Sequence, residues 1–199
     1  LNAVEGGKLT DAANLQHLRV ARGEWHLHQE LVGDAYVQAG VLLNKSSIKG
    51  DVHVASNAVY GGYGNARHVT VEGSLVANTV HGSPIIKGNL TLAEGATYSY
   101  GVTPEEFADP VFVEGTAKLE GADFAVYGAP GDYADTISKA VLYAKEIEGE
   151  FDKVTTNLAF MTPTLQYEKR QVDLTFRRNE VKVESVATSE SALGIAREI

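Results

Sequence analysis

Four segments of similar sequence decide the fold expected of this chain: IKGDVHV at residues 48–54, VEGSLVA at 71–77, IKGNLTL at 86–92 and VEGTAKL at 113–119. Each has an aliphatic residue, a charged residue and a glycine, followed by a short stretch in which apolar side chains alternate. Alternation with a period of two is typical of strands rather than helices. The glycines lie 23, 15 and 27 residues apart, so we expect some copies on different sides of a coil.

Short strands separated by turns are predicted throughout the first hundred residues. Clear examples are DVHV at 51–54, VTVE at 69–72 and LTL at 90–92, each flanked by glycine, asparagine or serine. The Asn-Gly and Asp-Gly dipeptides of tight β-hairpins are absent from the sequence. A parallel β-helix, in which each coil buries a few aliphatic side chains and stacks on its neighbours, fits these repeats. A β-sandwich is the alternative that they leave open.

The second half of the chain has more aromatic residues and longer strands. Twelve aromatic residues lie between Tyr98 and Phe176, against four before Tyr98. QVDLTFR at 171–177 alternates, so that Val172, Leu174 and Phe176 share one face. We therefore expect an aromatic core here and a small, aliphatic interior in the first part. The last fifteen residues, SVATSESALGIAREI, are predicted to form a short helix.

Composition argues against several classes of function. The 199 residues carry 17 Lys and Arg against 26 Asp and Glu, a formal net charge of −9. Nucleic acid is therefore not an expected partner, because its phosphates need a basic face. Residues 105–153 hold 12 acidic and 4 basic side chains. We interpret them as a solvated face that keeps the protein soluble, with a cation-binding or partner-binding surface as the alternative.

The chain has no cysteine, so neither a disulfide framework nor a thiolate metal site is available. Its longest apolar run falls well short of the roughly 20 residues of a membrane-spanning helix, so we expect no direct membrane insertion. The first residue is Leu1 and no signal peptide opens the sequence. We therefore expect the chain to be a piece of a longer precursor.

Four further segments follow one another between residues 95 and 179: GATYSYGV at 95–102, VFVEGTAKLEGADFAVYG at 111–128, APGDYADTISKAVLYA at 129–144 and GEFDKVTTNLAFMTPTLQYEKRQVDLTFRRN at 149–179. In their order, their PGDY turn and their closing strand they resemble the C-terminal passenger region of type V autotransporters, whose pertactin-like passengers are β-helical. Two features depart from that pattern. FADP at 107–110 replaces a lead-in richer in Gly and Asp, and Lys139, Lys145 and Glu146 make one strand pair more charged.

The resemblance implies a fold and a division of the chain. Residues 1–110 would be the last coils of a right-handed parallel β-helix. Residues 111–180 would form the capping segment called the autochaperone, with a hairpin or sandwich-like arrangement. Residues 181–199 would begin the linker, frequently helical in that family, that leads to an outer-membrane β-barrel absent from this sequence.

On the same resemblance, the cap is expected to have an aromatic core and fixed turns. The core candidates are Tyr127, Tyr133, Tyr143, Phe151, Phe160 and Phe176, with Leu158, Leu165 and Leu174 between them. Pro130-Gly131 and Thr162-Pro163 are predicted to form turns that set the strand register. Any β-domain needs aromatic residues and turns, so only the assembled pattern carries the specific interpretation.

The function implied by the resemblance is not enzymatic. Passengers of this family emerge C-terminal end first, so the cap would fold first outside the cell and promote translocation and surface display. Its partner would be the protein's own outer-membrane β-barrel, its location the surface of a Gram-negative bacterium, and no cofactor is expected. The alternative is an adhesin or virulence factor that contacts host cells or matrix, with the loop Tyr60-Gly61-Gly62-Tyr63-Gly64-Asn65 as the candidate binding site.

Residues capable of catalysis or metal binding are present without the spacing of a known site. His26 and His28 lie two apart on a predicted strand, a spacing that can hold a metal, but surface or half-buried histidines are the favoured interpretation. Ser83, in HGSP at 81–84, is not part of a GxSxG elbow. The glycine-rich loop at 60–65 lacks the Lys-Ser/Thr of a P-loop, and a tight turn or a protruding loop is expected instead. No catalytic or metal-binding residue is assigned.

Overall fold

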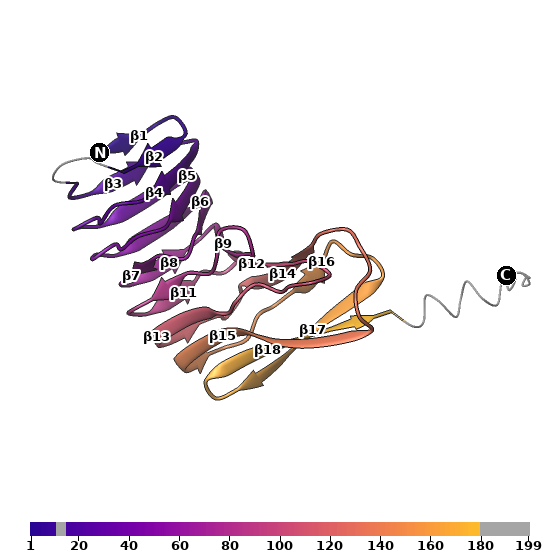
Figure 1. Ribbon diagram of the computed structural model, residues 1–199. Helices are drawn as coiled ribbons and strands as arrows, with labels where there is room; N and C mark the ends of the chain where they lie inside the picture. Colours follow the sequence, from indigo (N-terminus) through magenta and orange to yellow (C-terminus); the bar gives the residue numbers. More distant parts are fainter. Residues whose placement is uncertain (11–14, 180–199) are drawn as a thin grey trace, which may run out of the picture.

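The chain is all-β in the computed structural model, which describes residues 1–10 and 15–179. Within these residues, 18 strands join in one mixed sheet. Figure 1 shows them stacked one upon the next, from the N terminus to a hairpin near the other end. No helix in the described part of the chain is long and apolar enough to cross a membrane.

In chain order the strands are β1 (Asn2–Ala3), β2 (Gly7–Leu9), β3 (Leu18–Val20), β4 (Glu24–Leu27), β5 (Ala35–Asn44), β6 (Val52–Gly61), β7 (Asn65–Ala66), β8 (Val69–Val71), β9 (Ser74–Ala77), β10 (Ile85–Ile86), β11 (Leu90–Leu92), β12 (Thr97–Val102), β13 (Val111–Lys118), β14 (Asp123–Gly128), β15 (Thr136–Glu148), β16 (Val154–Thr156), β17 (Met161–Glu168) and β18 (Gln171–Arg178).

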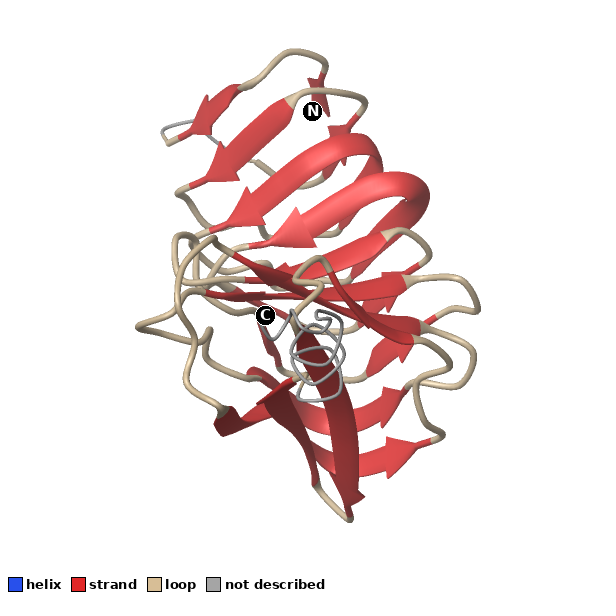
Figure 2. Cartoon of the chain, turned by 90° about the vertical axis from the view of Figure 1, so that its right-hand side faces the viewer, coloured by secondary structure: helices blue, strands red, loops and turns tan. Residues whose placement is uncertain are grey.

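Parallel pairing arranges most of these strands in three ladders. One ladder joins β1, β3, β5, β6, β8, β11, β13 and β15, and a second joins β2, β4, β5, β6, β9, β12, β14 and β16. A shorter third ladder joins β7, β10, β13 and β15. The long strands β5 and β6 bend between the first two ladders, as the curved ribbons in Figure 2 show. The chain thus returns to each ladder repeatedly and adds a layer each time.

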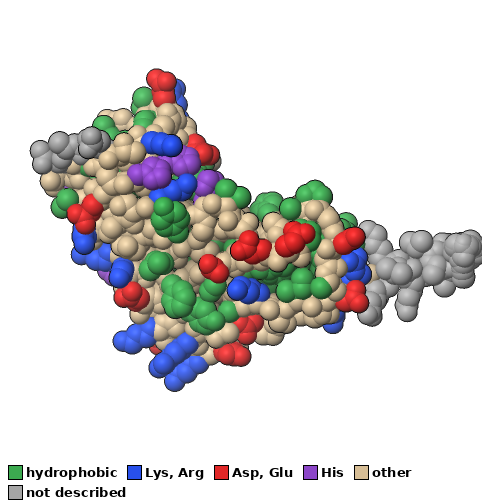
Figure 3. Space-filling model, viewed as in Figure 1, with side chains coloured by type: hydrophobic (Ala, Val, Ile, Leu, Met, Phe, Trp, Pro, Cys, Tyr) green, Lys and Arg blue, Asp and Glu red, His purple; other side chains and the backbone are tan. Residues whose placement is uncertain are grey.

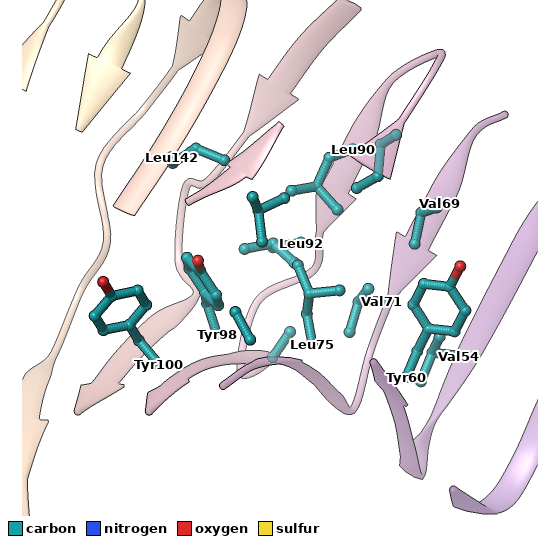
Figure 4. Packing of buried hydrophobic residues seen from close by; sticks show 14 of the residues in the cluster. Val54, Tyr60, Val69, Val71, Leu75, Leu90, Leu92, Tyr98, Tyr100 and Leu142 are labelled. Carbon is teal, nitrogen blue, oxygen red and sulfur yellow. The ribbon is translucent and has the colours of Figure 1, made fainter. Parts of the chain in front are cut away.

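The interior of the stack is filled by side chains that lie in register from layer to layer. Val52 pairs with Val69 and Val69 with Leu90, and all three are at most 1% exposed. Figure 4 shows Val54, Val71 and Leu75 among the side chains that point into the same interior. Burying one such side chain contributes about 1.5–3 kcal/mol. The alternation seen in the sequence therefore separates an aliphatic interior from a polar surface.

Polar side chains at one corner tie successive layers together. Each accepts a hydrogen bond from the backbone N–H of the equivalent residue one layer on. The bonds run from Asp34 to His17 Nδ1 (3.1 Å), from Asp51 to Asp34 Oδ1 (2.7 Å), from His68 to Asp51 Oδ1 (3.2 Å), from Asn89 to His68 Nδ1 (2.9 Å) and from Thr116 to Asn89 Oδ1 (2.9 Å). They supply partners for backbone donors at a bend, where the ladder itself provides none.

Three of the four repeated glycines lie at this corner, where a side chain has no room. A Cβ atom on Gly50 would lie 2.1 Å from Asp34 Oδ1, and one on Gly115 would lie 2.2 Å from Asn89 Oδ1. Gly88 faces His68 Nδ1 in the same way, at 2.4 Å. Gly73 instead packs on the backbone of Ala58, at a different bend. The irregular spacing of the glycines thus reflects two different corners, as the sequence predicts.

The parallel ladders end at β15 and β16. The second half of β15, Leu142–Glu148, pairs in parallel with β13, while Thr136–Tyr143 pairs antiparallel with β18. Among the described strands, β17 pairs only with β18 and completes a hairpin, residues 161–178, which we call the capping hairpin. The prediction for QVDLTFR is confirmed, since Val172, Leu174 and Phe176 are fully buried on one face of β18. The predicted linker helix falls in residues 181–199, outside the described residues.

Candidate functional site

The capping hairpin covers the end of the stack through main-chain pairing with β15. Seven residue pairs join β15 and β18, from Thr136 with Arg177 to Tyr143 with Gln171. Beyond them the N–H of Ala144 donates to the carbonyl of Arg170 at 3.1 Å. The part of the β15 edge that follows carries Lys145, Glu146 and Glu148, all exposed. A charged edge of this kind disfavours pairing with another chain.

A continuous series of aromatic contacts joins the hairpin to the stack. Neighbouring ring centroids lie 5.5–6.3 Å apart along the series Phe160, Tyr133, Phe176, Phe107, Tyr100, Phe124 and Phe151. Several pairs meet edge to face, an arrangement that stabilises beyond simple burial. The rings belong to β12, β14, β18 and the connections between strands. The hairpin and the last layers of the stack therefore share one core.

Buried hydroxyl groups in this core donate to main-chain carbonyls. Tyr98 Oη donates to the carbonyl of Val141 at 2.7 Å, and Tyr133 Oη donates to that of Ala129 at 2.6 Å. Tyr100 Oη donates to the carbonyl of Ala108. Burial raises the pKa of Tyr98 and of Tyr100 well above the ordinary value for tyrosine. These phenols stay neutral and act as structural donors.

Arg178, the last residue of β18, holds the connection between β14 and β15 against the hairpin. Its guanidinium donates to the carbonyl of Tyr133 at 2.5 Å and lies 3.4 Å from Asp135 Oδ1. The same group sits 5.4 Å from the centroid of the Phe160 ring. One side chain thus contacts two separate segments of the cap, the β14–β15 connection and the residue before β17.

The structure places the six predicted core residues in different environments. Tyr133, Phe151 and Phe176 are at most 7% exposed, and Tyr143 and Phe160 are partly buried. Tyr127 is 56% exposed, so its assignment to the core is wrong. In β14, Phe124 and Val126 point inwards, and alternation turns Tyr127 to the opposite face. Of the three leucines predicted to lie between these aromatic residues, Leu158 and Leu174 are buried and Leu165 is partly buried.

The core predicted from the sequence omits three aromatic residues that the structure buries. Tyr98, Tyr100 and Phe124 are at most 1% exposed and lie at its centre. Alternation within TYSYGV and DFAVYG marks all three as inward-facing, so the signal was present in the sequence.

One of the two predicted turns is wrong. Pro130 and Gly131 lie at a bend between β14 and β15, with Gly131 at a φ of 145°. Thr162 and Pro163 instead lie within β17, opposite Arg177 and Phe176. β17 pairs with one neighbour in the described residues, and an edge strand tolerates proline because one row of its N–H groups needs no strand partner.

The predicted binding loop at 60–65 is largely a buried corner. Tyr60 is fully buried, and its hydroxyl accepts a hydrogen bond from Asn44 Nδ2 at 3.0 Å. Burial raises the pKa of Tyr60 to about 12. Gly62, at a φ of 97°, and Gly64 pack against Asn44, and a Cβ on either would lie within 2.5 Å of it. Only Tyr63 of the six is more than half exposed, so the loop does not protrude as a whole.

The residues considered for metal binding and catalysis lie in other parts of the stack. His26 in β4 and His28 directly after that strand have stacked rings, with centroids 6.3 Å apart. The described residues contain no group of three or more His, Asp or Glu placed to hold a metal ion. Ser83 is almost buried, and its hydroxyl donates to the carbonyl of Asp109 at 2.6 Å.

An uncharged groove of about 410 Å³ lies beside Tyr127. Its lining comes from β9, β12, β14 and the turn at 78–82, with Ser99 and Gly101 among the lining residues. Val80, 79% exposed, and Tyr127 are its most exposed apolar residues. The groove is therefore mainly apolar, with a few hydroxyl and amide groups.

No family model matches this chain, and no match was found among the curated proteins.

Proposed function

We propose that this chain is the C-terminal part of the passenger of a bacterial autotransporter, and that its role is to cap a β-helix and nucleate its folding. Residues 1–110 are the last coils of a right-handed parallel β-helix, and residues 111–180 are the autochaperone. The chain acts without catalysis, at the cell surface of a Gram-negative bacterium, after passage through the outer-membrane β-barrel of the same protein. The resemblance in residues 95–179 and the three parallel ladders support this proposal.

The observation that carries the proposal is the aromatic core shared by the hairpin and the stack. In a stack of layers each layer contacts only its neighbours, so the first layer to form gains little stabilisation. Phe176 of the hairpin contacts both Tyr133 and Phe107, and Phe107 contacts Tyr100 of β12. A unit with its own core folds without upstream layers and then offers β12–β16 as a template. Sequential addition of layers outside the cell would bias transport outwards without ATP.

Limited proteolysis along a urea gradient tests this role, with fragments identified by mass spectrometry. The only tryptophan, Trp25 in β4, reports melting of the N-terminal layers through its fluorescence. We expect a fragment spanning about residues 95–179 to survive after the Trp25 signal has changed. Loss of the whole chain in one step would contradict an independent nucleus.

Two variants sharpen the test. Phe176→Ala removes a fully buried ring and should abolish the resistant fragment, while Tyr127→Ala changes an exposed ring and should leave it intact. In the full-length protein, Phe176→Ala should also reduce surface display more strongly than Tyr127→Ala. Equal display of the two variants would contradict the proposed role in translocation.

The second candidate function is a binding surface of an adhesin that contacts host cells or matrix. The groove beside Tyr127 favours this function more than the loop at 60–65 does, because Tyr127 and Val80 are exposed whereas Tyr60 is buried. Exposed aromatic side chains beside a hollow are common in binding sites. Loss of cell or matrix binding in the well-folded Tyr127→Ala variant would support this candidate.

A further inference from the structure

Three histidines and two lysines gather on one face of the N-terminal layers. His26 lies on β4 and His28 directly after it, Lys8 lies on β2, Lys45 just after β5, and His81 in the turn between β9 and β10. Lys8 pairs with His26 across neighbouring strands. Figure 3 shows histidines beside basic side chains in this part of the molecule. We call these five residues the His-Lys patch.

The imidazole rings of the patch are close and fixed in position. The His26 ring stacks on that of His28 with centroids 6.3 Å apart and meets that of His81 at 5.9 Å. His81 is positioned by its turn, where Asn78 Oδ1 accepts hydrogen bonds from the N–H groups of Val80 and His81. Residues distant in sequence thus present imidazole N–H groups, which can donate hydrogen bonds, on one surface.

One ring nitrogen of the patch has no hydrogen-bond partner in the described part of the chain. His81 Nδ1 is buried and makes no hydrogen bond within the described residues. A buried N–H without an acceptor is costly, so the neutral ring is favoured with its proton on Nε2. His81 Nε2 is then a donor for a ligand rather than an acceptor.

The charge of the patch differs from that of the whole chain. Lys8 and Lys45 are cationic, and Glu24, which lies 2.8 Å from His26 Nε2, is the carboxylate in contact with the patch. Burial and then Lys45 lower the pKa of both His28 and His81, with Lys8 and His26 adding to the effect on His28. The lowered pKa keeps His28 and His81 neutral at neutral pH, so acidification adds positive charge to a surface that is only weakly basic there.

We propose that the His-Lys patch binds a compact oligoanion, a ligand carrying several sulfate or phosphate groups, and binds it more tightly at mildly acidic pH. Donors about 6 Å apart suit several linked oxyanions better than a single ion. A compact ligand is favoured over a large polyanionic surface, because the rest of a chain with a net charge of −9 repels an extended anion. An anion also counteracts the mutual repulsion of the protonated rings, so binding takes up protons.

Titration calorimetry of the full chain at constant ionic strength tests the proposal. The probes are a sulfated tetrasaccharide, tripolyphosphate and the unsulfated tetrasaccharide, each at pH 5.5 and pH 7.5. We expect at least about tenfold tighter binding at the lower pH for an anionic probe, and no binding of the neutral sugar. Binding of both anions identifies their shared chemistry as the determinant. Binding of one alone identifies a sulfated glycan or a phosphate compound as the source.

Variants locate the site. His28→Gln combined with Lys45→Gln should weaken binding about tenfold or more and reduce its pH dependence. The matched control, His53→Gln with Lys49→Gln, removes the same residue types from ion pairs with Glu72 and Glu30 elsewhere on the stack, and should bind as the wild type does. Trp25 fluorescence checks that each variant is folded. Absence of binding at pH 5.5, or full binding by the patch variant, would overturn the proposal.

Discussion

The N-terminal layers and the C-terminal cap are stabilised in different ways. Residues 15–92 form layers whose interior is mostly aliphatic and whose corner side chains bond only to the next layer, 17 to 27 residues away. In residues 95–179, Tyr98 bonds to Val141 and Arg178 to Tyr133, 43 and 45 residues apart. The N-terminal layers therefore depend on their neighbours, while the cap has contacts that close on themselves. The two regions should respond differently to the same kind of substitution.

The largest effect is expected for Phe124→Ala. Phe124 is fully buried and its ring contacts Tyr98, Tyr100 and Phe151. Removing such a ring costs about 3–5 kcal/mol. If the cap is the template, urea unfolding should show earlier loss of both the near-ultraviolet tyrosine signal and the Trp25 fluorescence signal.

Leu75→Ala is the matched change in the layers, because Leu75 is also fully buried. It should shift the Trp25 transition and leave a protease-resistant cap. Phe112→Ala, at a residue 51% exposed, serves as the surface control. Should Phe124→Ala leave the Trp25 transition in place, the layers would be independent of the cap and the comparison would fail.

Gly50→Ala is expected to have an intermediate effect, confined to the layers. The new Cβ would lie 2.1 Å from Asp34 Oδ1 and 2.4 Å from the carbonyl oxygen of Gly33. Overpacking of this kind costs about 1–3 kcal/mol. The Trp25 transition should move to lower urea, whereas Lys49→Ala, at the exposed neighbouring residue, should change it by less than about 0.5 kcal/mol. If Gly50→Ala left the urea midpoint of the Trp25 transition unchanged, the corner would be less tightly packed than its geometry indicates.

The sequence predicts individual strands well because alternation is a local property. Val172, Leu174 and Phe176 are buried as their spacing requires, and the same rule applied to DFAVYG separates Phe124 from Tyr127. The error at Tyr127 came from judging it by residue type rather than by its position in the alternation. Local patterns are thus more reliable for orientation than aromatic character alone.

Features that depend on distant residues could not be predicted in the same way. Gly62 and Gly64 are required by Asn44, about 20 residues earlier, so their sequence alone suggests an open loop. Pro163 is accommodated because β17 has β18 as its partner, a fact of topology. The His-Lys patch combines residues from four parts of the chain, and no spacing in the sequence brings His81 to His26.

The smallest effect is expected for Asp51→Asn, and it should depend on pH. The Arg67 guanidinium and the N–H of His68 hold the pKa of Asp51 below its ordinary value, outweighing the opposing effect of burial. The folded state therefore binds this proton less readily than the unfolded state. The contribution of Asp51 to stability is present above its unfolded pKa, about 3.9, and is lost as the pH falls through the lower, folded value.

Asparagine keeps an oxygen that accepts from His68 but removes the charge and the second oxygen that accepts from Arg67, so the variant isolates the interaction with Arg67. The urea midpoint of the Trp25 signal should be slightly lower than wild type at pH 6, with the two midpoints converging towards pH 3. The loss should be smaller than that of Gly50→Ala because Asp51 is 44% exposed and its ion pair with Arg67 is screened by solvent. A difference that stays constant with pH would assign the stabilisation of this corner to hydrogen-bond geometry alone. The layers would then be held at their corners by shape and backbone pairing, in closer analogy to the cap, where neutral phenols make the equivalent bonds.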